Sequence, residues 1–187
     1  MKKKSLSVKK IIPRKLNFNK FLRDKKIIKI YNNFKKNFEN LINSKKIAVS
    51  VSGGADSLAL CFLVLCYKFK KNIKIQPSFY LVDHGLRENS SIEVRKVSGW
   101  LEAHGIDNHI LSWGVAKPKS GIQAAARIAR YDLMTSWCKE HKISPLLTAH
   151  HLEDQVETFL LRLECGSRLD GLSSMEYIRA NYSFESE

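Results

Sequence analysis

The fold is decided by residues 47–57, which read Ile47-Ala48-Val49-Ser50-Val51-Ser52-Gly53-Gly54-Ala55-Asp56-Ser57. Among the first five residues, the β-branched Ile47, Val49 and Val51 alternate with small side chains, which predicts a buried strand. The next six are small or polar, and apolar residues at helical spacing from Leu58 to Phe69 predict a helix after them. In such a turn, Gly53 and Gly54 let successive backbone N–H groups point into one concavity at the positive end of the helix. The sequence therefore predicts a phosphate-binding loop.

The side chains of this loop predict how phosphate is held. The hydroxyls of Ser52 and Ser57 add hydrogen-bond donors, and the Asp56 carboxylate is suited to a magnesium ion that bridges phosphates. The loop is not a Walker loop, because no Gly-Lys-Ser/Thr sequence closes it. The alternative is a tight strand-to-helix turn that binds no ligand. Six matched positions between a strand and a helix favour phosphate binding over that alternative.

The net charge of +14 belongs to the N-terminal segment. Residues 1–46 contain 14 Lys and 2 Arg with only Asp24 and Glu39 as acids, whereas residues 47–187 carry 16 basic and 16 acidic residues. Such a block can bind nucleic acid phosphates through counterion release. A solvated lysine-rich tail and an organelle-targeting extension are the alternatives. The start of the chain lacks the apolar region of a secretory signal.

Length, hydropathy and cysteines limit the class of protein. A chain of 187 residues with 44% hydrophobic content can bury one sizeable core. No apolar run reaches the roughly 18 residues that span a bilayer, so we expect no membrane partner. The four cysteines, at positions 61, 66, 138 and 165, form no CxxC pair and are expected to be buried free thiols in a reducing compartment. We therefore expect a cytoplasmic protein, or an organellar one if the basic segment is a targeting extension.

Strands and helices alternate along most of the chain. Residues 1–23 are expected to be flexible, because they are dense in basic residues and broken by Pro13. Ser90 and Glu93 have the spacing of a capping box at a helix start. The expected elements are helix 24–41, strand 47–51, helix 58–69, strand 75–82, helix 90–104, strand 107–113, helix 122–141, strand 145–148 and helix 151–164. This order predicts an α/β fold with a parallel, twisted, Rossmann-like sheet and helices on both faces.

Residues that can carry chemistry follow the predicted strands, at the edge where parallel sheets bind ligands. After the second strand come His84 and Arg87, within Asp83-His84-Gly85-Leu86-Arg87. On helix 122–141, Gln123, Arg127 and Arg130 share one face. A guanidinium near the phosphate loop would stabilise charge that develops on an α-phosphate. A solvated basic face is the alternative.

Histidines and acids gather after the last strand. His150, Asp154 and Glu157 are four and three residues apart and share a helix face, and His151 lies three before Asp154. Acidic residues are favoured near any helix N-terminus, which is the alternative explanation. The cluster predicts a site for an amine or a metal ion.

Taken together, these motifs resemble those of a known family. Ser52–Ser57 is similar to the pyrophosphate loop, or PP-loop, of the N-type ATP pyrophosphatases, which split ATP between the α- and β-phosphates. Over roughly residues 45–178 the chain resembles the N-terminal catalytic domain of the tRNA(Ile)-lysidine synthetases. The further residues that carry this resemblance are Asp83-His84-Gly85-Leu86-Arg87, Gln123, Ala126-Arg127, Arg130-Tyr131, Leu147-Thr148-Ala149-His150-His151, Asp154-Gln155, Glu157-Thr158, Gly171-Leu172 and Met175.

The resemblance implies a fold, a division of the chain and a reaction. The fold is that of an adenine nucleotide alpha hydrolase-like PP-loop domain. Residues 1–44 would form a basic extension with an amphipathic helix, residues 45–178 the catalytic domain and residues 179–187 a tail. The family uses ATP and L-lysine to convert the cytidine at the first anticodon position of tRNA(Ile)(CAU) to lysidine, through an adenylated cytidine, with release of pyrophosphate and AMP.

The resemblance also implies roles for individual residues. Asp56 would hold Mg²⁺ on the ATP phosphates, and Arg127 would stabilise the transition state at the α-phosphate. Asp154 and Glu157 would bind the lysine ammonium and help its amine lose a proton. The supporting residues would be His84, Arg87, Arg130, His150 and His151.

The sequence departs from the family pattern in places. Glu153-Asp154 stands where the family has Asp-Asp, and Cys165-Gly166-Ser167-Arg168 where it has Arg-Gly-Ser-Gly. Family members continue well beyond the equivalent of Glu187, so we expect a fragment or a reduced protein. A non-catalytic ATP- or tRNA-binding remnant is the main alternative. A PP-loop tRNA thiolase is a weaker one, because no cysteines are paired by spacing. A homodimer is left open.

Overall fold

The computed structural model describes residues 16–42, 44–71, 75–87, 89–115, 117, 118 and 120–149. The chain divides into two compact units, Met1–Leu147 and Thr148–Glu187, and the elements below belong to the first. They are α1 (Phe18–Phe21), α2 (Lys25–Leu41), β1 (Lys46–Ser50), α3 (Ala55–Lys71), β2 (Gln76–Asp83), α4 (Ser90–Ala103), β3 (Asn108–Ser112), α5 (Ile122–Glu140) and β4 (Leu146–Leu147). The predicted helix 151–164 lies outside the described residues.

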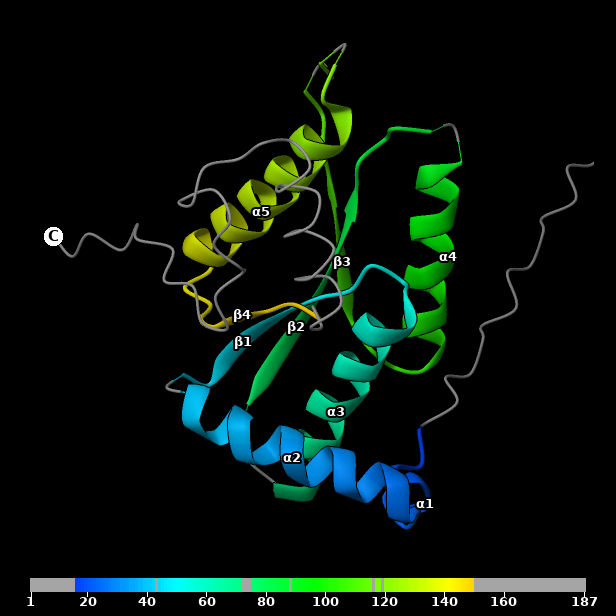
Figure 1. The fold of residues 1–187 in the computed structure, drawn as a ribbon, viewed down its shortest axis with the longest axis vertical. Helices are drawn as coiled ribbons and strands as arrows, with labels where there is room; N and C mark the ends of the chain where they lie inside the picture. Colours follow the sequence, from blue (N-terminus) through cyan, green and yellow to red (C-terminus); the bar gives the residue numbers. More distant parts are fainter. Residues whose placement is uncertain are drawn as a thin grey trace, which may run out of the picture. The chain divides into compact units, whose positions relative to one another are not determined.

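The strands form one parallel sheet in the order β3-β2-β1-β4 (Figure 1). β1 pairs with β2 and with β4, and β2 pairs with β3, all in parallel. The carboxyl ends of these strands therefore meet at one edge. Beyond the ladder, the Val51 amide donates to the Tyr80 carbonyl at 2.8 Å, which extends the order of β1 to the start of the phosphate loop. The predicted parallel α/β fold is confirmed.

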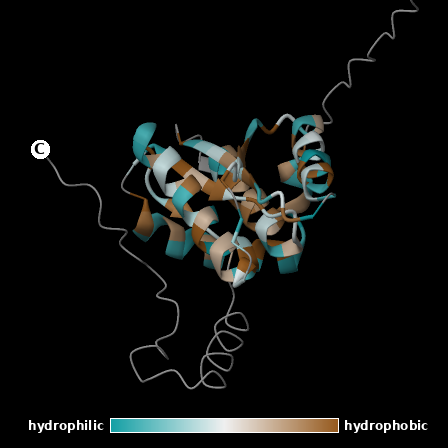
Figure 2. Cartoon of the chain, turned by 90° about the horizontal axis from the view of Figure 1, so that it is seen from above, coloured by the Kyte–Doolittle hydropathy of each residue, from teal (hydrophilic) through white to brown (hydrophobic). Residues whose placement is uncertain are grey.

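Side chains of each strand alternate between the two faces of the sheet, and helices cover both faces. On one face Val49 and Leu81 pack in a core with residues of α2, α3 and α4. On the other, Ala48 and Tyr80 pack with Met134 and Cys138 of α5. Figure 2 shows apolar residues in brown where helices meet strands, and hydrophilic residues in teal on outer turns. Burial of both faces explains why the strands are apolar throughout.

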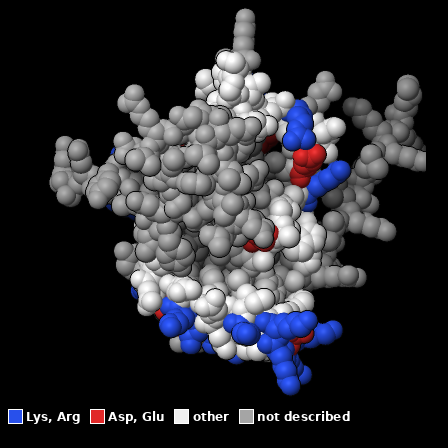
Figure 3. Space-filling view, in the orientation of Figure 1, with Lys and Arg blue, Asp and Glu red and all other residues white. Residues whose placement is uncertain are grey.

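The amphipathic helix predicted over residues 24–41 is confirmed as α2. Its cap is the Asp24 carboxylate, which accepts from the amides of Lys26 at 2.8 Å and Ile27 at 3.1 Å. Tyr31 and Phe38 are buried against the core. Basic side chains remain on the outside of this end of the unit (Figure 3).

The prediction that residues 1–23 are flexible is wrong for the C-terminal part of that segment. The short helix α1 forms here, capped by the Asn17 side chain, which accepts from the Lys20 amide at 3.1 Å. Aromatic contacts with α3 hold it: Phe21 meets Phe62 edge to face, with ring centroids 5.1 Å apart. Aromatic contacts of this kind stabilise the helix despite the local charge density.

Two further sequence predictions are tested by the described residues. Cys61, Cys66 and Cys138 are free and buried, as expected. Burial raises the pKa of Cys61 and Cys66 to about 12 and of Cys138 to about 11. Among the described helices, none is long and apolar enough to cross a membrane.

Candidate nucleotide and RNA site

The phosphate loop connects β1 to α3, and α3 begins inside it, at Ala55. Ser57 is only 6% exposed, and its hydroxyl stabilises the loop through hydrogen bonds to the loop itself. It donates to the Gly54 carbonyl at 2.9 Å and accepts from the Ser52 amide at 3.1 Å. The Ser52 hydroxyl lies 3.1 Å from it and accepts from the Gly54 amide at 3.3 Å. The Ser57 hydroxyl is thus engaged within the loop, and its predicted contact with phosphate stays a prediction.

Gly53 is required by the shape of this loop. Its φ is +88°, a left-handed value that L side chains rarely adopt. A Cβ at this position would also lie 2.7 Å from Cγ2 of Val97 on α4. Gly54 has neither constraint: a Cβ there would meet the Ser52 hydroxyl oxygen at 3.5 Å, an ordinary contact. Gly53 therefore lets the loop close tightly against α4.

The loop presents the start of α3 as an anion site. The Leu58 amide donates to the Gly54 carbonyl at 3.1 Å, so the hydrogen-bond pattern of α3 begins here, and the amides of a first helical turn point out of the helix start. These amides carry the positive end of the helix dipole. Asp56 lies in this first turn with an exposed carboxylate, the kind of oxygen ligand that Mg²⁺ prefers. The arrangement suits a polyphosphate with a magnesium ion.

The loop after β2 is held by a carboxylate instead. Asp83 Oδ1 accepts from the Gly85 amide at 2.9 Å and the Ser90 hydroxyl at 3.2 Å, and Oδ2 accepts from the Ser91 hydroxyl. Burial alone would raise the pKa of Asp83, but the three hydrogen bonds and the charge of Arg95 lower it below its ordinary value. Asp83 therefore ties the end of β2 to the start of α4 as an anion.

This arrangement corrects the predicted capping box. The N-cap of α4 is Asn89, its side chain makes no capping hydrogen bond, and Ser90 already lies within the helix. The hydroxyls of Ser90 and Ser91 donate to Asp83, whereas a capping side chain would accept from helix amides. Ser90 is not at the N-cap position, and its hydrogen bond to an ionised group is stronger than one between neutral groups.

His84 and Arg130 meet beside this loop. Burial, followed by the charge of Arg130, lowers the pKa of His84, with Asp83 acting weakly in the opposite sense. Among the described residues, neither Nδ1 of His84 nor Nε of Arg130 has a hydrogen-bond partner, although both atoms are buried. Buried polar atoms usually have partners; among the described residues the third atom without one, Oδ1 of Asn108, lies at the start of β3, whereas His84 Nδ1 and Arg130 Nε belong to residues at the carboxyl edge. They make this corner a place where a ligand would complete the hydrogen bonding.

The remaining site residues divide into those that are described and those that are not. On α5, the guanidiniums of Arg127 and Arg130 lie 5.8 and 5.3 Å from the Tyr131 ring centroid. Arg127 is exposed, Arg130 is half-buried, and Gln123 and Arg87 are exposed. The predicted lysine site, with His150, His151, Asp154 and Glu157, lies outside the described residues.

The sequence motif 83–87 includes Asp83, but roles were predicted there only for His84 and Arg87, and none was predicted for Trp113 or Lys117. The role of Asp83 could have been predicted from the sequence, because an acid that ends a strand ahead of a glycine and two adjacent serines can accept hydrogen bonds from the start of the next helix. Trp113 and Lys117 belong to a segment that the sequence marks only as a strand end and a loop. Their proximity to the β2 loop comes from the pairing of β3 with β2, which the sequence alone does not give.

Comparison with known proteins places the chain in a family. The model for the PP-loop domain matches residues 24–185. The chain is 45% identical over 137 residues to a tRNA(Ile)-lysidine synthase of Wolbachia sp. subsp. Brugia malayi, a match that covers 73% of this chain and 32% of that protein. The same name belongs to relatives in Rickettsia akari, 45% identical over 148 residues, with 78% and 34% covered, and Zymomonas mobilis, 42% identical over 132 residues, with 71% and 38% covered. The chain thus spans about a third of the length of the curated relatives it matches.

A solved structure supports the fold. The U34-tRNA thiolase NcsA from Methanococcus maripaludis, solved with its 4Fe–4S cluster, matches with a TM-score of 0.63 at 19% identity, over 82% of this chain and 57% of that one. At this identity the likeness speaks for the fold alone. With a family match over most of its length and the strand–loop–helix geometry described above, the chain belongs to the PP-loop domain family.

Proposed function

We propose that the chain is the ATP-using part of a tRNA(Ile)-lysidine synthase, a ligase that attaches L-lysine to the first anticodon cytidine of tRNA(Ile)(CAU). The observation that carries this proposal is the 45% identity to tRNA(Ile)-lysidine synthases across the unit that contains the phosphate loop. The geometry of the loop agrees, since a positive-φ glycine and a helix start suit a nucleotide polyphosphate.

In the proposed first step, the cytidine C2 oxygen attacks the α-phosphorus of ATP. The bond from that phosphorus to the bridging oxygen breaks, pyrophosphate leaves, and an adenylated cytidine results. The amides at the start of α3 would hold the departing phosphates, and Arg127, exposed on α5, would stabilise charge on the α-phosphate. Asp56 would hold Mg²⁺ on the phosphates, where the ion would neutralise charge on their oxygens.

In the proposed second step, the lysine ε-amine attacks C2 of the activated cytidine. AMP leaves with the former C2 oxygen, and the amine loses a proton to complete lysidine. Asp154 and Glu157 would bind the ammonium and assist this proton loss. His84, Arg87, Arg130, His150 and His151 are proposed to support the two steps. A cytoplasmic location and a homodimer stay predictions.

The thiolase alternative is disfavoured by the three cysteines that the structure describes; Cys165 lies outside the described residues. Sulfur transfer needs reactive thiolates or cluster ligands, and Cys61, Cys66 and Cys138 are buried with pKa values raised to about 12, 12 and 11. A non-catalytic ATP- or tRNA-binding remnant is the second candidate, because the chain spans about a third of its relatives' length.

The test is to incubate the 187-residue chain with ATP, Mg²⁺, radiolabelled lysine and a tRNA(Ile) transcript that bears CAU. We expect lysine to enter the tRNA, pyrophosphate to be released only with tRNA present, and both signals to vanish when the anticodon cytidine is replaced by uridine. ATP binding without incorporation would instead mean a fragment of such an enzyme or a non-catalytic binding remnant.

A further inference from the structure

A tryptophan stands at the carboxyl edge, one residue past β3. The Trp113 amide donates to the Asp83 carbonyl at 2.9 Å, so the β2–β3 ladder fixes its backbone. Its half-exposed ring meets His84 edge to face, with centroids 6.4 Å apart and planes at 87°. The indole is thus held in place beside the buried Nδ1 of His84, which has no hydrogen-bond partner within the described part of the chain, while part of the ring remains open to solvent.

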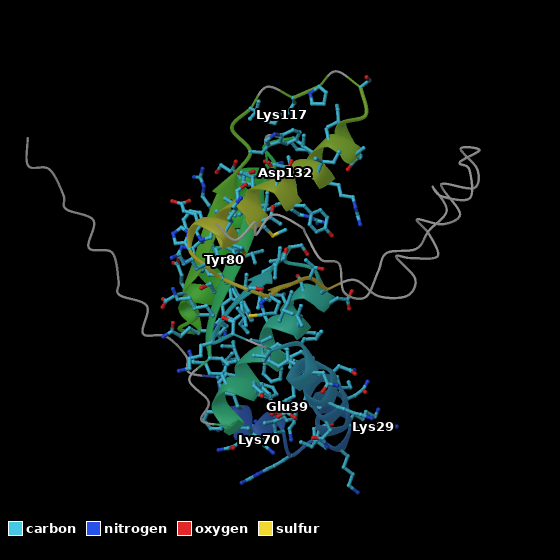
Figure 4. The ribbon with its side chains drawn as sticks, turned by 90° about the vertical axis from the view of Figure 1, so that its left-hand side faces the viewer. Lys29, Glu39, Lys70, Tyr80, Lys117 and Asp132 are labelled. Atoms are coloured by element: carbon cyan, nitrogen blue, oxygen red, sulfur yellow. The ribbon has the colours of Figure 1, made fainter. Side chains whose placement is uncertain are left out.

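Lys117 reaches back over this ring from the loop between β3 and α5. Its Nζ lies 5.8 Å from the Trp113 ring centroid. A Cβ at position 85 would lie 3.0 Å from Nζ, and Gly85 has a φ of +56°, so the lack of a side chain there leaves room for the ammonium. Figure 4 shows Lys117 at the opposite end of this unit from Lys29 and Lys70.

The surroundings of Lys117 suit an anion. Among the described residues its partner is the indole ring, not a carboxylate. The neighbouring acid, Asp83, already accepts three hydrogen bonds from Gly85, Ser90 and Ser91. In the same loop Val115 is 70% exposed and Ile122, at the start of α5, is 41% exposed. An ammonium beside an indole and exposed apolar side chains is typical of a contact surface for nucleotides.

Strand order favours RNA over ATP as the source of that nucleotide. β3 is two strands away from β1, so Trp113 lies roughly 10 Å across the sheet from the strand that leads into the phosphate loop. A nucleotide next to the reacting cytidine would have to occupy a neighbouring part of the same edge. Base stacking on tryptophan and phosphate pairing with lysine are the usual means of holding a single-stranded nucleotide.

We propose that Trp113 and Lys117 form a subsite for a single-stranded nucleotide of the RNA substrate, with the base stacked on the indole and a phosphate on the ammonium. This inference rests on the proposed RNA substrate but not on lysine transfer. The subsite would position the anticodon strand while the phosphate loop holds ATP.

Tryptophan fluorescence gives a test that does not depend on activity. The chain has three tryptophans, so the double substitution Trp100→Phe and Trp137→Phe leaves Trp113 as the only indole. We expect an anticodon stem–loop RNA with a CAU loop to quench Trp113, and Mg-ATP alone to leave it unchanged. Quenching by Mg-ATP alone, or no response to RNA, would overturn the subsite.

Matched variants of the full chain then assign the two contacts. Trp113→Ala should weaken stem–loop binding about 5- to 150-fold, and Trp113→Phe should restore most of it, because a phenyl ring still stacks. Lys117→Ala should reduce the slope of log affinity against log salt by about one. Lys68→Ala removes the same charge from an exposed position on α3, outside the basic segment 1–46, and serves as its control. Equal effects of the two lysine variants, or a loss of ATP rather than RNA affinity, would contradict the proposal.

These outcomes separate the subsite from the proposed function. If Trp113 responds to RNA but no lysine is incorporated in the assay above, the subsite stands and the ligase activity of this chain falls. If lysine is incorporated and the Trp113 and Lys117 variants bind and react like the parent chain, the ligase stands and the subsite falls.

Discussion

The loops after β1 and β2 reach the same edge of the sheet but are held by different forces. Neutral hydroxyls brace the first: Ser57 and Ser52 bond to the loop's own backbone. An anion braces the second, where Asp83 accepts three hydrogen bonds and ties β2 to α4. The first arrangement leaves a positive helix end open for phosphate. In the second arrangement the donors stabilise the negative charge of Asp83 and fix it between β2 and α4.

Gly53→Ala should have the largest effect on stability and ATP affinity, because it distorts the loop after β1 and leaves the loop after β2 unchanged. The left-handed φ costs about 1–3 kcal/mol for a residue with a Cβ, and the 2.7 Å contact with Val97 adds strain. We expect a loss of about 2–4 kcal/mol in the free energy of unfolding, measured with urea, and at least a tenfold loss in ATP affinity.

Two variants control for this prediction. Gly99→Ala lies in α4, where a Cβ would meet nothing within 4 Å, and should stabilise the protein by about 0.5–1 kcal/mol. Adding Val97→Ala to Gly53→Ala should recover only part of the loss, because the φ strain remains. Full recovery would mean that φ at this position is unimportant.

Asp83→Asn weakens the hydrogen bonds that hold the loop after β2 and leaves the loop after β1 unchanged. An amide accepts fewer and weaker hydrogen bonds, so we expect a loss of about 1–2 kcal/mol at pH 7. Because the folded pKa of Asp83 is lowered, its stabilising contribution is present above the unfolded carboxyl value of about 4 and is lost as pH falls through the folded value. The variant should therefore lose less stability than the parent between pH 5 and 3. Asp107→Asn, at an exposed acid before β3, is the control and should leave that pH dependence unchanged.

The sequence predicts these two loops unequally, for a physical reason. Gly53 and Gly54 between a strand and a helix are enough to predict the first, because its contacts are local. The anchoring of Ser90 and Ser91 by Asp83 depends on the place where β2 delivers its last side chain relative to α4, so local spacing predicted a capping box instead. Likewise α1 is held by the contact of Phe21 with Phe62, about forty residues away in the chain. Periodicity in one stretch carries no information about such distant partners.

Ser57→Ala tests whether the Ser57 hydroxyl stabilises the loop after β1. The substitution removes the acceptor of the Ser52 amide and the donor to the Gly54 carbonyl. We expect a loss of about 1–2 kcal/mol in unfolding free energy and a severalfold loss in ATP affinity, both nearly independent of pH. Ser112→Ala, at the exposed end of β3, should change neither. If Ser57→Ala kept full stability but lost ATP affinity, the hydroxyl would act on phosphate directly rather than as a brace.

Arg130→Gln should have the smallest effect, and it tests the charge balance next to the second loop. Burial and Arg130 lower the pKa of His84, so the neutral imidazole is favoured in the folded protein. The stability associated with that neutral form is complete above the unfolded value of about 6.5 and is lost as pH falls below it. Removing the guanidinium should raise the pKa of His84 toward, but not to, that value, because burial remains.

An NMR titration of the His84 ring would measure the shift, and urea unfolding at pH 7 and pH 5 should show a smaller loss of stability on acidification in Arg130→Gln than in the parent. Arg127→Gln, an exposed position on the same helix, is the control and should leave the titration of His84 unchanged. No change in the His84 pKa on removal of Arg130 would mean that the guanidinium does not repel the imidazolium. The neutral form of His84 would then be set by burial alone.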